Sequence, residues 1–344
     1  MSASRSQSAP SSDREALEAT SLWFVKHGLP YFVPEERGAA GAALRSRRTV
    51  VTVALTVVVA LAAGVPLAWR LGDAALAPAT LVLMVGLAML VYAATALRAR
   101  PIATWAVART LGSLRLLLPL ATRALPLLLL FVTFLFINAE VWQVSATLDG
   151  AVLWVTVMLF AFVAVAFLLV RLPEELVRAD DERGPDRLVE ACADTPLESR
   201  ARDLVEGTEE AELHGSAQVH GFERANLLLV LVIAQSVQVL LLSVSVFGFF
   251  MVFGGIVMTE PVQESWTGHQ TTSLPLLDNL SVELVQVSVF LAAFSGLYFT
   301  VYAVTDEAYR DQFFTDVKKE LDRAVGVRAV YLALRRRSDA LAEP

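Results

Sequence analysis

The sequence predicts an all-α, polytopic membrane protein with six transmembrane helices and short cytoplasmic amphipathic helices. Hydrophobic residues make up 56% of the 344 residues, and charged residues make up only 18%. A helix needs about 20 predominantly apolar residues to cross the roughly 30 Å hydrocarbon core of a bilayer. Soluble domains do not contain six unbroken apolar runs of that length. The six runs are 49–69, 74–97, 124–145, 151–170, 227–253 and 281–303.

The distribution of basic residues predicts how these spans are oriented. If the N-terminus lies inside, 27 of the 28 Lys and Arg residues fall on the cytoplasmic side, and only Arg70 falls outside. Cationic segments stay on the cytoplasmic side during membrane insertion. We therefore expect both termini in the cytoplasm.

The N-terminal region, residues 1–48, is expected to be a cytoplasmic tail that contains an interfacial helix. Ser12 and Glu15 match a capping box, and Gly28 stands where a glycine would end the helix. The aromatic stretch LPYFVP at 29–34 suits the headgroup boundary of a bilayer. This pattern predicts a short helix that docks on the inner membrane surface.

Residues 49–170 are expected to hold spans one to four, with a connector at 98–123 between spans two and three. The connector carries five arginines on an apolar background that is interrupted by proline. We expect an interfacial helix here, bent near Pro119 and Pro126, because proline breaks the hydrogen bonding of a helix.

Span three contains an acidic residue, Glu140, whose position relative to the membrane must be explained. A start at Ala124 keeps Arg123 out of the hydrocarbon, where a central arginine costs about 2.5–3.5 kcal/mol. Glu140 then lies about 24 Å along the helix, about 6 Å short of the outer boundary. Two alternatives stay open. Its carboxylate reaches the outer headgroups, or it faces inward beside Asn138 or Gln143 in an acidic outer vestibule.

The expected external segments are acidic, which supports such a vestibule. Acidic surfaces concentrate cations, and carboxylates at a pore mouth select for them. Against the single external arginine, these segments hold Asp73, Asp149, Glu260, Glu264 and Asp278, with Glu283 at the start of span six.

Spans five and six, within residues 226–303, carry polar side chains and are joined by the largest expected external loop, 259–280. Gln235 and Gln238 share one face of span five, near mid-membrane by our interpretation, and should point into the bundle because an amide facing lipid is costly. These faces either interlock dry or line a wet path. Span six carries a polar stripe of Ser288, Ser295, Tyr298 and Tyr302.

Two further cytoplasmic regions are expected, an acidic loop at 171–225 and an amphipathic C-terminal helix at 304–344. The loop should contain helices near 186–193 and 196–206. The C-terminal helix repeats an apolar residue every fourth position, a stripe that must pack on the loop helices or on a partner protein. The stripe is Tyr309, Phe313, Val317, Leu321 and Val325.

The stretches LWFVKHGLPYFVPEE and TDEAYRDQFFTDVKKELDRAVGVRAVYLAL resemble an uncharacterised family of multi-pass membrane proteins from high-GC Gram-positive bacteria. The resemblance implies a location in the bacterial inner membrane. It implies no activity, substrate or site.

The sequence contains no motif that indicates an enzyme. H-E-x-x-H, G-x-S-x-G and G-x-x-x-x-G-K-[ST] are all missing, and the four histidines do not cluster. The single cysteine, Cys192, excludes a disulfide within the chain. The acidic net charge of −7 gives no reason to expect nucleic acid as a partner. We expect no cofactor and no metal.

Two classes of function stay open. In the first, which we rank narrowly ahead, the bundle passes a cation or a small cationic solute, alone or as a homo-oligomer. In the second, the protein is a membrane scaffold or regulator whose cytoplasmic helices bind a partner. The residues expected to form the polar path or vestibule are Asn138, Glu140, Gln143, Gln235, Gln238 and Glu283.

Overall fold

The computed structural model describes most of the chain. The described residues are 9–45, 47–71, 84–86, 88, 92, 99–112, 128–148, 150–178, 185–208, 219–274, 277–305 and 307–340. Within some helices, including the stretches 304–305 and 307–318, only the backbone is described. Nearly all of these residues are helical, and the only sheet among them has two strands.

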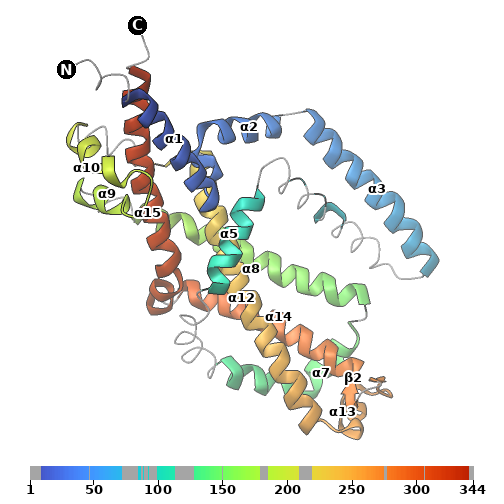
Figure 1. The fold of residues 1–344 in the computed structure, drawn as a ribbon. Helices are drawn as coiled ribbons and strands as arrows, with labels where there is room; N and C mark the ends of the chain where they lie inside the picture. The colour runs from blue at the N-terminus through green and yellow to red at the C-terminus, as the bar shows by residue number, and fades with distance from the viewer. Residues whose placement is uncertain are drawn as a thin grey trace, which may run out of the picture.

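Three long apolar helices form the centre of the molecule (Figure 1). They are α8 (Gly150–Arg178), α12 (Phe222–Val257) and α14 (Val282–Thr305). Their apolar segments coincide with the fourth, fifth and sixth expected spans, and each is long enough to cross a membrane. These helices indicate a membrane protein.

Helix α14 lies between α8 and α12 and packs on both. Helices α12 and α14 run antiparallel, since Ser243 lies beside Gly296 and Gly254 beside Leu284. A Cβ atom at Gly296 would come within 2.4 Å of the Ser243 hydroxyl oxygen. The two helices can approach this closely because the glycine has no side chain, as is common between membrane helices.

The third expected span, 124–145, is not one continuous helix, so this part of the prediction is wrong. A helical segment at 128–136 and helix α7 (Ala139–Ala146) meet at an angle of 74°. Between them, Asn138 has an extended backbone, and its side-chain oxygen accepts hydrogen bonds from the backbone N–H groups of Glu140 and the residue after it. This is an N-cap, and it starts a second helix.

The expected count of six spans is not confirmed. Three helices of the described chain, or four if the bent pair is one span, are long and apolar enough to cross a membrane. The first expected span, 49–69, forms the 25-residue helix α3 (Arg47–Leu71). The second, 74–97, lies almost entirely outside the described residues.

At one end of the bundle, α7 and the segment between α12 and α14 form a unit that we call the cap. This segment was expected only as a loop at 259–280, and it contains regular structure. It consists of helix α13 (Glu260–Thr267) and an antiparallel pair of short strands, β1 (Ser273–Leu274) and β2 (Leu277–Ser281). Helix α13 packs on α7, where the rings of Trp142 and Trp266 meet edge to face.

At the opposite end lies a unit that we call the head, which brings both chain termini together (Figure 1). Its helices are α1 (Ala9–Lys26), η1 (Pro30–Phe32), α2 (Pro34–Arg45), α9 (Pro185–Ala191), α10 (Glu198–Glu206) and the second half of α15 (Glu307–Ala340). Helices α9 and α10 confirm the two expected in the acidic loop. Gly28 has the expected left-handed backbone, with φ +73°, whereas α1 begins at Ala9, before the expected cap at Ser12.

Helix α15 packs on other helices of the head, namely α1, α9 and α10. Val325, the last residue of the expected apolar stripe, is buried there. The side chains of the four other stripe residues lie outside the described part of the chain. In the same core, Phe24 contacts Phe32 and Tyr331 edge to face, at centroid distances of 5.4 and 5.6 Å.

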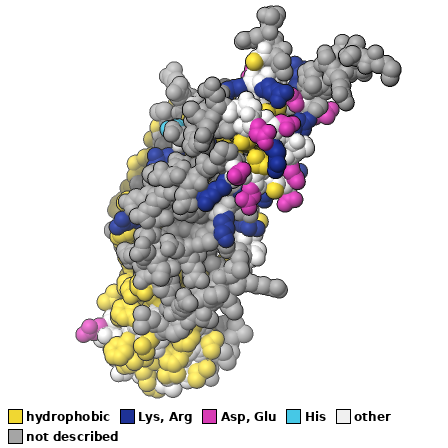
Figure 2. Space-filling model, turned by 90° about the vertical axis from the view of Figure 1, so that its left-hand side faces the viewer, with side chains coloured by type: hydrophobic (Ala, Val, Ile, Leu, Met, Phe, Trp, Pro, Cys, Tyr) yellow, Lys and Arg dark blue, Asp and Glu magenta, His cyan; other side chains and the backbone are white. Residues whose placement is uncertain are grey.

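The two ends differ in surface chemistry. In Figure 2, acidic and basic side chains gather over the head, and hydrophobic side chains cover the opposite end. Helix α5 (Ala99–Gly112), the first part of the expected connector, packs along α12. Pro119 and Pro126, the expected bend points, lie outside the described residues.

Candidate functional site

The six residues expected to form a polar path lie in three separate places. Asn138, Glu140 and Gln143 are exposed around the start of α7. Gln235 and Gln238 lie in the part of α12 nearer the head, and Glu283 lies in the first turn of α14, next to the cap. The structure therefore provides two polar regions inside the fold, one at each end of the bundle.

The two glutamines of α12 lie near the head-side end of the bundle, not at its middle. Because Ser243 lies beside Gly296 in an antiparallel pair, Gln238 falls at about the level of residue 301, close to the end of the α14 span at Ala303. Helix α12 has 36 residues and is about 54 Å long at about 1.5 Å per residue, so it extends well beyond a core of roughly 30 Å. The glutamines therefore lie nearer one end of the α14 span than its middle, and their mid-membrane position stays a prediction.

Both glutamines are nonetheless inside the protein. Gln235 has no exposed surface, and Gln238 is partly buried. Within the described residues, the side-chain oxygen of Gln238 and the hydroxyl of Ser288 are buried without a hydrogen-bond partner. Such groups are uncommon in native proteins, so they mark positions where a further polar group would be favourable.

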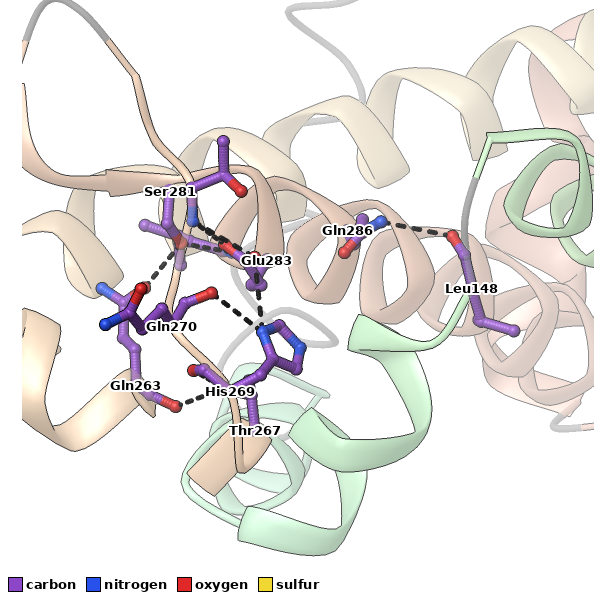
Figure 3. Close-up of polar contacts among 10 residues, drawn as sticks. Leu148, Gln263, Thr267, His269, Gln270, Ser281, Glu283 and Gln286 are labelled. Carbon is purple, nitrogen blue, oxygen red and sulfur yellow. Dashed lines mark hydrogen bonds and ion pairs between the residues drawn. The ribbon is translucent and has the colours of Figure 1, made fainter. Parts of the chain in front are cut away.

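Glu283 is the centre of a polar cluster in the cap (Figure 3). Its side chain is almost fully buried, and its two oxygens accept hydrogen bonds from the backbone N–H of Thr272, at 3.3 and 3.1 Å. Nδ1 of His269 lies 4.0 Å from the carboxylate and 2.9 Å from the carbonyl oxygen of Gln270. The carboxylate thus fixes the start of the hairpin against the first turn of α14.

A second part of the same cluster joins α12, α13 and α14. The Ser281 hydroxyl donates to the Gln263 side-chain oxygen at 2.5 Å and accepts from the N–H of Leu284 at 2.9 Å. The Gln263 amide donates to the carbonyl oxygen of Met258 at 2.8 Å, and Gln286 donates to that of Leu148 at 3.4 Å. Figure 3 shows that the side chains of Ser281 and Gln263 point toward each other, and that Gln286 points separately toward Leu148.

Sequence reasoning singled out Glu283 and missed the other residues of the cluster. Gln263, His269 and Ser281 occur in a polar loop, where such residues are ordinary, and no spacing marks them as neighbours. Over the residues that the structure describes, no group of three or more His, Cys, Asp or Glu side chains is arranged to hold a metal ion.

The head contains the most strongly charged buried contact that the structure describes. The side chain of Glu223, in the first turn of α12, is only 3% exposed and pairs with Arg37 of α2 and Arg328 of α15. The distance from Arg328 Nη2 to the Glu223 carboxylate is 2.6 Å. A buried carboxylate requires such partners, because the desolvation of an unpaired charge is very costly.

Asn226 extends this contact to the N-terminal segment. It lies one turn after Glu223, and its side chain accepts from the N–H of Tyr31 at 3.0 Å and donates to the carbonyl oxygen of Gly28 at 2.8 Å. We call Arg37, Glu223, Asn226 and Arg328 the clasp. The clasp holds three segments, near residues 30, 225 and 330, at the head end of α12.

The head also contains a more exposed ion pair and a buried, unreactive thiol. Arg335 pairs with Glu35 at 2.9 Å, and a backbone hydrogen bond together with this arginine lowers the pKa of Glu35. Cys192 is fully buried, and burial raises the pKa of its thiol to about 12. A thiol in this state is a poor nucleophile, since the thiolate is the reactive form.

No model of a known protein family matches the chain, and neither does any curated protein or solved structure. Function is therefore inferred from the geometry of the head, the bundle and the cap.

Proposed function

We propose that the protein is a non-transporting membrane scaffold or regulator that presents its head in the cytoplasm. The observation that carries the proposal is the clasp at the first turn of α12. It ties both ends of the chain to a helix that continues through the apolar bundle to the cap. The head is thereby an ordered body in fixed relation to the membrane helices, as a docking platform requires.

The outer face of the head supports a polar partner. Its apolar side chains are used in its own core, where α15 packs on α1, α9 and α10. The exposed residues of α9, α10 and the turn between them include more acids than bases: Asp186, Glu190, Asp194, Glu198, Asp203 and Glu206 against Arg187 and Arg202. A basic surface on another protein would complement this face.

The cytoplasmic position of the head follows from the bias of basic residues and can be tested by labelling. In a Cys192→Ser background, Ser273→Cys in the cap should react with an impermeant thiol reagent in intact cells. Ser199→Cys, at an exposed position in the first turn of α10, should react only after lysis. The reverse pattern would place the head outside. The native Cys192 is a poor reporter, because it is buried.

The scaffold proposal predicts that purified protein in liposomes conducts no cations. Flux of monovalent and divalent cations should equal that of empty liposomes. A photo-crosslinking residue at Glu190 or Glu198, both exposed on the head, should trap a discrete protein in cells, and the same residue at Glu260 in the cap should not. Measurable cation flux, or equal trapping from both ends, contradicts the proposal.

Cation transport is the second candidate, and one observation favours it. The unpartnered oxygens of Gln238 and Ser288 would suit a polar solute that passes along α12 and α14. In that case Glu140→Gln should reduce flux most clearly at low ionic strength, where the Debye length is long. Gln238→Leu should block flux while the protein still folds, because leucine suits a helix interface.

A further inference from the structure

An apolar groove runs along the bundle on the side where α8 and α12 diverge from each other. Helix α14 forms its floor, and the cavity has a volume of about 430 Å³. This lies within the roughly 300–1,000 Å³ typical of small-molecule sites. The lining includes small buried residues, such as Ala164 of α8 and Ala292 and Gly296 of the floor.

The groove opens sideways. Its rim residues Trp154, Leu240 and Val244 are 59%, 61% and 56% exposed. They lie on segments apolar enough to be within a membrane, so the groove faces the hydrocarbon of the bilayer and not water. An occupant that enters from the side must therefore be apolar along most of its length.

The length of the groove fits one extended hydrocarbon chain. The lining of α8 runs from Trp154 to Leu168, which is about 21 Å at about 1.5 Å per residue. One leaflet of a roughly 30 Å core is about 15 Å thick. A chain that enters from the head side can thus lie in the groove over the full depth of its own leaflet.

The head-side end of the groove is more polar than the rest and adjoins a cation. Ser236 and Thr300 line this end, at the levels of α12 and α14 nearest the head, and Ser243 lies near the middle of the groove beside Gly296. Arg171 follows Leu168 by one turn on α8, and its side chain is exposed. A cation at the end of an apolar groove complements an anionic headgroup.

We infer that this groove binds a phospholipid from the head-side leaflet, with one acyl chain between α8 and α12 and an anionic headgroup beside Arg171. The shape and apolar lining select the chain, and the arginine selects the charge of the headgroup. The inference is independent of the scaffold function, because it rests on the bundle and not on the head.

Native mass spectrometry of the detergent-purified protein tests the inference. Wild type should retain an anionic phospholipid, and Ala161→Phe, which places a ring in the groove, should reduce the retained lipid at least fivefold. The matched control is Ala166→Phe, on the opposite face of α8, which should retain as much lipid as wild type. Equal retention by all three proteins, or equal loss from both variants, overturns the inference.

The headgroup is tested by adding lipids with identical chains. Phosphatidylglycerol should raise the melting temperature of wild type more than phosphatidylcholine does, and Arg171→Gln should remove the difference while Arg100→Gln, on α5, keeps it. A wild-type protein that shows no preference contradicts the role of Arg171. If Ala161→Phe instead converts a dimer to a monomer in size-exclusion chromatography without changing bound lipid, the groove holds a second copy of the chain, and the inference fails.

Discussion

The two ends of α12 hold their neighbours by different chemistry. At the head, Glu223 forms ion pairs with arginines that are 186 and 105 residues away in the sequence. At the cap, Ser281 and Gln263 are 18 residues apart, and their contacts use hydroxyl and amide groups. The head therefore forms only when distant parts of the chain have met. In the cap, the contacts among α13, the hairpin and the start of α14 lie within one continuous segment, and the packing of α7 on this segment joins distant residues.

This difference predicts which substitutions will destabilise the protein most. Removal of one partner from a buried ion pair leaves an unpaired charge, which costs about 3–5 kcal/mol. Loss of a neutral hydrogen bond costs about 1 kcal/mol when the partner can find water. Substitutions at the head should thus reduce stability more than those at the cap.

The largest effect is expected for Glu223→Leu, which leaves Arg37 and Arg328 without their carboxylate. We expect the free energy of unfolding to fall by about 3 kcal/mol, the lower end of the range because Arg37 is partly exposed. The measurement is thermal unfolding in detergent together with proteolysis of the head. Glu190→Leu, at an exposed site on α9, serves as the control, and equal melting temperatures for the two variants would show that the clasp does not stabilise the head.

The bundle should respond next, through the close contact of α12 with α14. Gly296→Ala places a methyl group against the Ser243 hydroxyl and should cost about 1–3 kcal/mol, as overpacking does. Adding Ser243→Ala should restore part of the loss, because the remaining Cβ lies at an ordinary 3.8 Å. Gly248→Ala, where nothing lies within 4 Å of the new methyl, should be neutral. A double variant no more stable than Gly296→Ala would refute this account of the helix contact.

A smaller and more local effect is expected for Gln263→Leu in the cap. The change removes the hydrogen bonds to Ser281 and to the Met258 carbonyl, which should cost about 1–2 kcal/mol. Hydrogen exchange should rise in β2 and the first turn of α14 while the head stays protected. If protection in the head falls by the same amount, the two ends are one cooperative unit.

The smallest effect concerns pH and the exposed pair of Glu35 and Arg335. The pKa of Glu35 is lowered from its ordinary value of 4.5, first by a backbone hydrogen bond and then by Arg335, so its contribution is complete above that value. It is lost as the pH falls through the lowered pKa. The contribution of this pair to stability should therefore be constant from pH 7 to 5, and Glu35→Gln should reduce the additional loss below pH 4.5 by less than about 1 kcal/mol. Acid unfolding curves of wild type and Glu35→Gln measure this contribution. Identical curves would show that the Glu35–Arg335 pair does not contribute to stability.

The sequence by itself determined the elements whose signals are local and repeated. The apolar runs of α8, α12 and α14 predicted helices long enough to cross a membrane, because burial in hydrocarbon requires about 20 apolar residues in a row. The two short helices of the acidic loop and the glycine at residue 28 were predicted for similar reasons, since amphipathic spacing and a C-cap glycine can be read from neighbouring residues.

Only the tertiary structure decided where the polar residues of the site lie. Asn138 is a residue type that is preferred at N-caps, but the apolar run around it has the length of one span and favoured a continuous helix. Only the backbone conformation shows that a second helix starts there. Glu223, Arg37 and Arg328 show no pattern in the sequence, and their pairing follows from the way that α2, α12 and α15 pack. The groove likewise forms where α8 and α12 pack on α14 with a space between them. The spacing between two helices cannot be predicted from the apolar pattern of either one.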